Sequence, residues 1–297
     1  MENIISKMIN RIRIVYRKKG LIATAEKLFL QVPYRHVKGY INYFMKAHKH
    51  EQATVFLASF PKGGSTWVAR MLSSIDGFGW HTPLDWYSKE EGQADYDLYE
   101  GLFDEVKHRF TVIRGHTAPT DSNVRILRDS GLKYIITVRD PRDKIVSAYW
   151  YIWNKTIHPY HAFARSRSLE EFIDYKLESG EYKGSIAWME GWFRNRDEER
   201  SMIIRYEDLL RDTHSTFRKI LDFLSLKCSE DEINRIVEQN SFKNITGRKS
   251  GEEDTKSFFR KGVSGEWKEI FSEEQKKKCS KIGDEVLALF GYESTIN

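Results

Sequence analysis

The sequence predicts an α/β fold of three layers, with a central, mainly parallel sheet flanked by helices. Short apolar runs alternate along the chain with segments of helical periodicity. The apolar runs lack the regular alternation of a half-exposed strand, which is typical of parallel strands buried on both faces. Polar turns follow several of these runs directly, at the carboxyl ends of strands where such sheets bind ligands.

Four short runs rich in apolar and β-branched residues are the expected strands. They span residues 55–60, 110–113, 134–138 and 202–206. Segments with helical spacing of apolar residues lie between and after these runs. The expected helices span residues 65–74, 123–130, 142–153, 169–179, 182–195, 213–226, 229–240 and 272–290.

Charge divides the chain into an arm and a body. Residues 1–50 carry eleven Lys and Arg against two Glu, a net charge of +9 within the total of +5. The rest of the chain is therefore mildly acidic, and no repeat, low-complexity tract or Pro/Gly-rich linker divides it. The whole chain has 40% hydrophobic residues, enough for a sizeable core. We expect a basic helical extension over residues 1–50 and a single domain over residues 51–297.

The arm has two interpretations. Ile5, Met8, Ile12 and Val15 recur at helical spacing among Arg and Lys residues. Such a helix packs its apolar face on the body, or it lies on a membrane surface and contacts anionic lipid through residues 1–20. A nucleic-acid partner is not expected, because the positive charge is not spread over the face of a domain.

Several features predict a cytoplasmic protein, and they leave open a peripheral contact with a membrane. No stretch approaches 18 uncharged apolar residues, and the N-terminus lacks the apolar segment of a secretory signal. The two cysteines, Cys228 and Cys279, lie far apart in sequence, so no disulfide framework is expected. No compact group of His, Cys and Asp has the spacing of a metal site, and we expect no metal.

The turn after the first expected strand, within the stretch FLASFPKGGSTW, has the composition of a phosphate cradle. Gly63 and Gly64 allow positive φ and a close approach of the backbone to a ligand. Ser65 or Thr66 is expected to cap the next helix, whose N-terminus favours an anion, and Lys62 adds a full positive charge. The lysine precedes the glycines, unlike in a Walker A loop. Taken alone, the stretch is also consistent with a tight strand–helix connection.

A second anion site is predicted after the strand at residues 134–138. Arg139 stands at the carboxyl tip of that strand, and Pro141 suits the first turn of the following helix. Ser147, eight residues after Arg139, lies about two turns into that helix. Arg139 can bind a phosphate through two hydrogen bonds, and Ser147 can add a hydroxyl. Two phosphate sites at neighbouring strand ends imply a ligand that is phosphorylated at two places.

With these motifs the sequence resembles the PAPS-dependent sulfotransferases of the cytosolic type, whose donor is 3′-phosphoadenosine 5′-phosphosulfate (PAPS). FPKGGSTW resembles their 5′-phosphosulfate loop, Y-P-K-S-G-T-T-W. Arg139 and Ser147 resemble their 3′-phosphate motif, and RKGVSGEWK, which begins at Arg260, resembles R-K-G-x-x-G-D-W-K. The three motifs occur in the family's order. The resemblance spans about residues 54–290 and implies a P-loop-like α/β fold.

The resemblance implies roles for further residues. Trp67, Tyr206 and Phe242 would contact the adenine of the donor. His116 follows an expected strand in a segment similar to the family's K-T-H, whose His is the catalytic base, and Arg114 replaces the family's Lys. The loop that contains the third motif, called the late loop below, would close on the 3′-phosphate through Arg260, Lys261 and the backbone of Gly262.

The expected reaction is in-line transfer of the sulfuryl group from PAPS to a hydroxyl or an amine. His116 would deprotonate the acceptor, a proton transfer that His performs near neutral pH. Lys62 and the backbone N–H groups of residues 63–66 would stabilise the departing phosphate. By family resemblance Ser147 would restrain Lys62 until the acceptor arrives.

The acceptor, a small molecule or a glycan, stays open. Aromatic-rich loops at residues 76–105 and 153–168, with Trp80, Trp86, Tyr87 and Trp153, are expected to wall its pocket. The oligomeric state also stays open, because the family's dimer segment would fall on residues 268–277, where its Thr-Val pair is absent. Two alternatives remain: a P-loop nucleotide kinase that uses ATP, and a non-catalytic protein that binds a nucleotide or a membrane surface.

Overall fold

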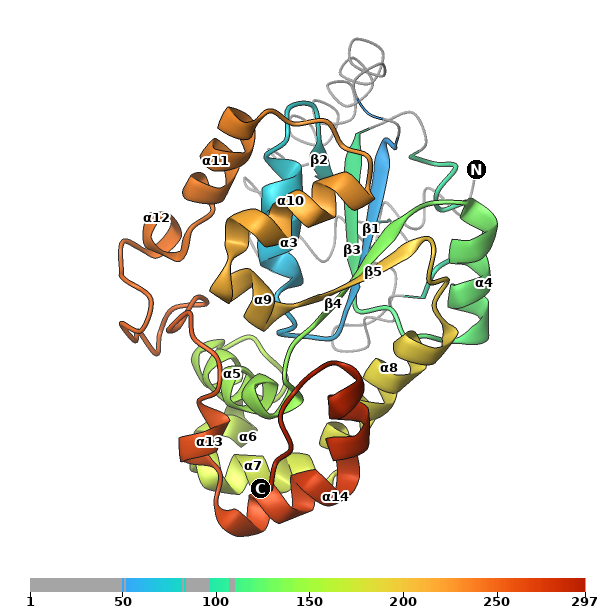
Figure 1. Cartoon of the computed structure of the whole chain (residues 1–297). Coiled ribbons are helices and arrows are strands. Elements are labelled where there is room, and N and C mark those ends of the chain that lie inside the picture. Colours follow the sequence, from blue (N-terminus) through green and yellow to red (C-terminus); the bar gives the residue numbers. More distant parts are fainter. Residues whose placement is uncertain (1–49, 51, 82, 84–96, 107–109, 297) are drawn as a thin grey trace.

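The computed structural model describes residues 50, 52–81, 83, 97–106 and 110–296 (Figure 1). Its centre is a five-stranded sheet in the order β2-β3-β1-β4-β5, in which every pair of neighbours is parallel. The predicted parallel sheet is confirmed, and β2 is the strand that the sequence did not predict, because three residues carry too little pattern. The strands are β1 (Thr54–Ser59), β2 (Gly79–His81), β3 (Thr111–Gly115), β4 (Tyr134–Val138) and β5 (Ser201–Arg205).

Helices cover both faces of the sheet and form two apolar clusters. Val55 and Leu57 of β1 belong to one cluster, whereas Phe56 and Ala58 belong to the other. One face is covered by α3 (Ser65–Ser73), α9 (Tyr206–Arg211), α10 (Thr213–Phe223) and α11 (Glu230–Gln239), and α12 (Phe242–Thr246) follows. The opposite cluster contains α4 (Asp121–Ser130), α5 (Pro141–Asn154), α6 (His161–Arg165), α7 (Leu169–Glu178), α8 (Glu181–Asn195), α13 (Trp267–Ile270) and α14 (Glu273–Leu289). This double cover explains why β1 is buried throughout and shows no alternation.

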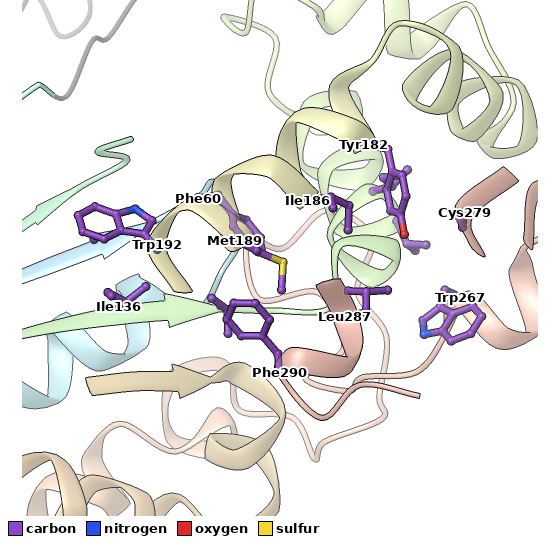
Figure 2. Close-up of a cluster of buried hydrophobic side chains, with 14 of the residues drawn as sticks. Phe60, Ile136, Tyr182, Ile186, Met189, Trp192, Trp267, Cys279, Leu287 and Phe290 are labelled. Atoms are coloured by element: carbon purple, nitrogen blue, oxygen red, sulfur yellow. The ribbon is translucent and has the colours of Figure 1, made fainter. Parts of the chain in front are cut away.

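The larger cluster joins α8 to the sheet and to α14 (Figure 2). Trp192 of α8 lies beside the sheet and contacts the ring of Tyr134, with the ring centroids 6.1 Å apart. Gly283 lets α14 approach α8 closely, since a Cβ there would lie 2.6 Å from Cδ1 of Ile186. The C-terminal helix is therefore packed into the same core as the central strands.

A buried polar network fixes the start of α5 against the C-terminal segment. Pro141 is at the first turn of α5, as predicted, and Asp140 caps it by accepting from the backbone N–H of Arg142. The Arg142 side chain is 1% exposed and donates to Asp140, to Thr295 Oγ1 at 2.7 Å and to the Glu293 carbonyl. Its guanidinium also lies 3.7 Å from the centre of the Trp267 ring.

The expected arm, residues 1–50, lies outside the described residues apart from His50, so the division into arm and single domain stays a prediction. Within the described ranges, none of the helices has the length and apolar character that crossing a bilayer requires. Cys228 packs on one face of the sheet and Cys279 in the cluster on the other face.

Replacing Arg142 with Met should cost about 3–5 kcal/mol of unfolding free energy, because Asp140 would be left as a buried charge without its partner. Urea denaturation measures this cost. Arg125→Met is the matched control, since Arg125 and Glu100 form an exposed pair, and it should change the free energy by no more than about 0.5 kcal/mol. Equal costs for the two variants would contradict the structural role assigned to Arg142.

Candidate active site

A cavity of about 340 Å³ opens at the carboxyl ends of the strands. Lys62, His116, Arg139 and Tyr206 follow the ends of β1, β3, β4 and β5 and reach its wall. The structure thus gathers predicted residues from four strands. The other predicted residues in the wall are Gly64, Ser65, Thr66, Trp67, Ser147, Phe242, Arg260, Lys261 and Gly262.

Gly63 is the predicted residue that is not part of the wall. It lies behind the cradle, where a Cβ would come within 3.0 Å of the Phe60 carbonyl oxygen and 3.3 Å of the Thr137 carbonyl oxygen. Its backbone N–H donates to the Phe60 carbonyl at 3.1 Å. The glycine is therefore needed for the close packing of the turn rather than for direct contact with a ligand.

The turn between β1 and α3 has the geometry of an anion cradle. Gly64, at φ 87°, is the N-cap of α3. It packs against the ring of Tyr206, since a Cβ at Gly64 would lie 2.8 Å from Cδ2 of that ring. Ser65 and Thr66 are the first helical residues, so the prediction that one of them caps the helix was wrong. The left-handed conformation of Gly64 leads the chain directly into α3 without a capping side chain. Among the described residues, the backbone N–H groups of Gly64, Ser65 and Thr66 have no hydrogen-bond partner, which fits an anion at this helix N-terminus.

Lys62 lies at the entrance of the cradle in a left-handed conformation, with φ 67°. Its ammonium nitrogen is 4.2 Å from the centre of the Phe258 ring and 4.6 Å from that of Tyr151. Burial lowers the pKa of Lys62 to about 7, and the nearby positive charges of Arg139 and Arg260 act in the same direction. At pH 7 Lys62 is therefore only partly protonated, and an anion bound beside it would favour the charged form.

Arg139 is 7% exposed and lines the cavity. Its Nη2 donates to the Val263 carbonyl at 3.3 Å, and its guanidinium lies 4.4 Å from the centre of the Tyr206 ring. Its Nε is buried and has no hydrogen-bond partner among the described residues. A buried donor without a partner is costly, and a phosphate oxygen of the ligand would satisfy it.

The late loop closes the cavity on the side of Arg139. Arg260 forms ion pairs with Glu253 and Glu266, and Lys261 Nζ lies 3.0 Å from the Glu266 carboxylate. Gly262, at φ 67°, packs directly on the ring of Phe242, since a Cβ there would lie 2.7 Å from Cδ2. The conformation of the loop thus depends on glycine at this position.

The three predicted adenine contacts lie together. Trp67 and Tyr206 meet edge to face with their ring centroids 6.2 Å apart. The indole N–H of Trp67 donates to the Asn240 carbonyl at 2.9 Å, which fixes the ring at the cavity wall. Phe242 completes this aromatic side of the cavity.

His116 lies at the wall near the cradle. Its Nδ1 is 2.9 Å from the Ser59 carbonyl oxygen, so we assign the ring proton to Nδ1. Burial lowers the pKa of His116 to about 4, and Arg114 and Lys144 contribute in the same direction. The imidazole is therefore neutral at pH 7, and its Nε2 has the lone pair that a general base requires.

Several residues of the cavity were not predicted from the sequence, and Arg114 was noted there only as the replacement of the family's Lys. Arg114 donates to Thr66 Oγ1 at 3.0 Å and reaches the cradle from β3. Trp150, Tyr151 and Phe258 line the cavity; Tyr151 lies one helical turn after Ser147, a signal that the spacing offered. Of the aromatic residues predicted for the acceptor pocket, Trp80 and Trp153 are not in the wall, and Trp86 and Tyr87 lie outside the described residues.

The charge of the wall is strongly positive. Five cationic side chains line it, and Glu266 is the one carboxylate among the described residues there. The cations are Lys62, Arg114, Arg139, Arg260 and Lys261. The described residues hold no group of three His, Cys, Asp or Glu that could bind a metal ion. The fold and the cavity define an α/β enzyme for a ligand with several negative charges.

Comparisons with known proteins agree with this class. The family described as "Sulfotransferase domain" matches residues 52–291. Sulfotransferase 2A1 of Homo sapiens is 26% identical over 79% of this chain and 84% of its own length. The amine sulfotransferase of Oryctolagus cuniculus is 26% identical over 80% of this chain and 81% of its own. The structure of a mouse sulfotransferase, SULT7A1, was solved with PAP, the desulfated form of the donor. It superposes with a TM-score of 0.60 at 20% identity, and the match covers 84% of this chain and 90% of the mouse chain.

The chain belongs to the sulfotransferase domain family. The family predicted from the three motifs is thereby confirmed, and so is the P-loop-like α/β fold. The protein is a PAPS-dependent sulfotransferase, and the alternative of an ATP-dependent kinase is not favoured.

Binding of PAP, the desulfated product of the donor, should take up a proton at pH 8. Lys62, whose pKa is about 7 in the free protein, is largely neutral at this pH, and the bound anion favours its charged form. The affinity for PAP should accordingly fall as the pH rises above 7. Calorimetry in two buffers of different ionisation enthalpy measures the proton count.

Lys62→Arg is the control, because a guanidinium keeps its charge at pH 8. It should remove most of the proton uptake and flatten the fall in affinity above pH 7. A proton count that is equal in the wild type and in Lys62→Arg would assign the uptake to another group.

Proposed function

We propose that this sulfotransferase moves the sulfuryl group in line from PAPS to a hydroxyl or an amine of a small-molecule acceptor, with His116 as the general base. The observation that supports this most directly is the cavity itself, in which one neutral imidazole and five cations converge at the strand ends. The donor supplies the sulfuryl group and a phosphate leaving group. Side chains and backbone groups of this chain bind the donor, accept the proton and stabilise the leaving group.

His116 accepts the proton of the attacking group at Nε2. The Ser59 carbonyl holds the ring through Nδ1 and fixes this tautomer. Because the imidazole is neutral at physiological pH, the base is ready without prior deprotonation. Its low pKa makes it a weak base in the free protein, so the proton moves together with bond formation rather than before it.

The opposite end of the reacting bond lies at the cradle. The N–H groups of Gly64, Ser65 and Thr66 and the ammonium of Lys62 stabilise the negative charge that develops on the departing phosphate. The 3′-phosphate is bound by Arg139, through its unpaired Nε, and by the loop cations Arg260 and Lys261. Trp67, Tyr206 and Phe242 hold the adenine, and Ser147 adds its hydroxyl from the α5 wall.

The acceptor side is aromatic. Trp150 and Tyr151 of α5 and Phe258 of the late loop line the cavity, which favours a flat, apolar body on the acceptor. Relatives include an amine sulfotransferase and the 3-alpha-hydroxysteroid sulfotransferase of Cavia porcellus, so both nucleophiles occur among similar proteins. Contact of residues 1–20 with a membrane, the cytoplasmic location and the oligomeric state stay predictions.

Replacing His116 with Ala should lower kcat by about 10²–10⁴-fold, the usual contribution of a general base. Affinity for PAP should stay within about twofold of the wild type, because the Ala leaves the cradle and the loop intact. Turnover is measured with saturating acceptor, and PAP binding by calorimetry. His214→Ala, at a half-exposed position beside Glu230, is the matched control. Undiminished turnover in His116→Ala would remove this residue from the mechanism.

Incubation with labelled PAPS and with labelled ATP tests the donor, and a panel of acceptors tests the nucleophile. The panel contains a phenol, a steroid alcohol, a primary amine and a sugar, and products are detected by mass. We expect sulfated product from PAPS and no transfer from ATP. Transfer of phosphate from ATP alone would establish the kinase, whereas PAP binding without any product would favour the non-catalytic alternative.

A further inference from the structure

The ammonium of Lys62 lies between two aromatic rings. Nζ is 4.2 Å from the centroid of Phe258 and 4.6 Å from that of Tyr151, within the range of a cation–π contact. The two rings meet edge to face, with their centroids 5.8 Å apart. Within the described part of the chain, no hydrogen bond joins Lys62 to Ser147, the partner that family resemblance suggests. The lysine thus has aromatic partners in place of a hydroxyl.

The two rings come from segments that are held together independently of Lys62. Tyr151 belongs to the last turns of α5, and Phe258 to the loop between α12 and α13. The side-chain amide of Asn154 donates to the Thr255 carbonyl and ties this loop to the end of α5. Lys155 Nζ donates to the Tyr151 hydroxyl at 2.6 Å and restrains that ring. Contacts other than those with Lys62 therefore hold the two rings in the cavity wall.

The rings attract the ammonium while its other neighbours repel it. Arg139 and Arg260 lie close enough to disfavour a charged Lys62. The negative π faces of Tyr151 and Phe258 offset part of this repulsion. The attraction is modest, since Phe258 is 49% exposed. A phosphosulfate anion would attract the ammonium far more strongly than a ring does.

We propose that Tyr151 and Phe258 form a cation seat that holds the Lys62 ammonium in the free enzyme and competes with the 5′ end of the donor for it. The two rings are positioning residues that act through Lys62, and this inference rests on the proposed role of that lysine at the 5′ end. Binding of the donor removes the ammonium from the seat. Release of PAP returns it, so the seat weakens product binding and speeds dissociation.

Fluorination of Phe258 tests the seat, because it weakens the π face while the shape of the ring is nearly kept. Phenylalanine, 4-fluorophenylalanine and 3,4,5-trifluorophenylalanine are placed at position 258 of the full chain. A weaker seat competes less for Lys62, so PAP should bind more tightly in the order of fluorination, by about two- to fivefold for the trifluoro ring. Its dissociation rate should fall in the same order. Calorimetry and stopped-flow displacement measure the two quantities.

The same series at Phe223 is the matched control. Lys133 Nζ lies 5.6 Å from the centroid of the Phe223 ring. Phe223 packs on the face of the sheet opposite to Tyr151, and neither Phe223 nor Lys133 lines the cavity. Fluorination there should leave PAP binding unchanged. Graded tightening at position 258 alone supports the seat, whereas no trend or weaker binding at position 258 overturns it and leaves the proposed function intact. A wild-type protein that does not bind PAP would overturn the proposed function and the seat with it.

Discussion

Repulsion among cations is the constraint on which the rest of the site depends. Five positive side chains share one cavity with a single carboxylate among the described residues of its wall. The protein offsets part of the repulsion with aromatic rings and a carboxylate. Lys62 lies against two rings, Arg139 against the ring of Tyr206, and the loop cations against Glu266. None of these partners matches a bound polyanion, so the cavity keeps a strong preference for one.

Such a site needs a rigid support, and one face of α5 provides much of it. Asp143 in the first turn accepts from the backbone N–H groups of Gly265 and Trp267, at 2.5 and 3.2 Å, and so holds the late loop. Ser147, Tyr151 and Asn154 follow at intervals of four, four and three residues and therefore lie on the same side of the helix. A single helix thus fixes both ends of the loop that closes the cavity.

The sequence predicted what depends on local pattern. The four longer strands, and residues such as Arg139 that follow their ends, were expected within one or two positions, because parallel strands place their carboxyl ends at one edge. Partners across the cavity were not predictable in this way. The contact of Lys62 with Phe258 joins positions 196 residues apart, and the capping role of Gly64 depends on a backbone angle. Trp80 was expected in the acceptor wall for its type, but it packs beside Arg114 instead.

In the proposed mechanism, burial and positive charge connect binding of the donor to the strength of the base. Burial is the main cause of the low pKa of Lys62, about 7, and of His116, about 4, and positive neighbours add to it: Arg139 and Arg260 at Lys62, Arg114 and Lys144 at His116. In the free protein His116 is therefore neutral but weakly basic. Negative charge brought into the cavity by the donor should raise both pKa values, so that His116, as the proposed base, would be stronger once the group to be transferred is in place. Until the donor arrives, burial and the charges of Arg114 and Lys144 keep His116 a poor base.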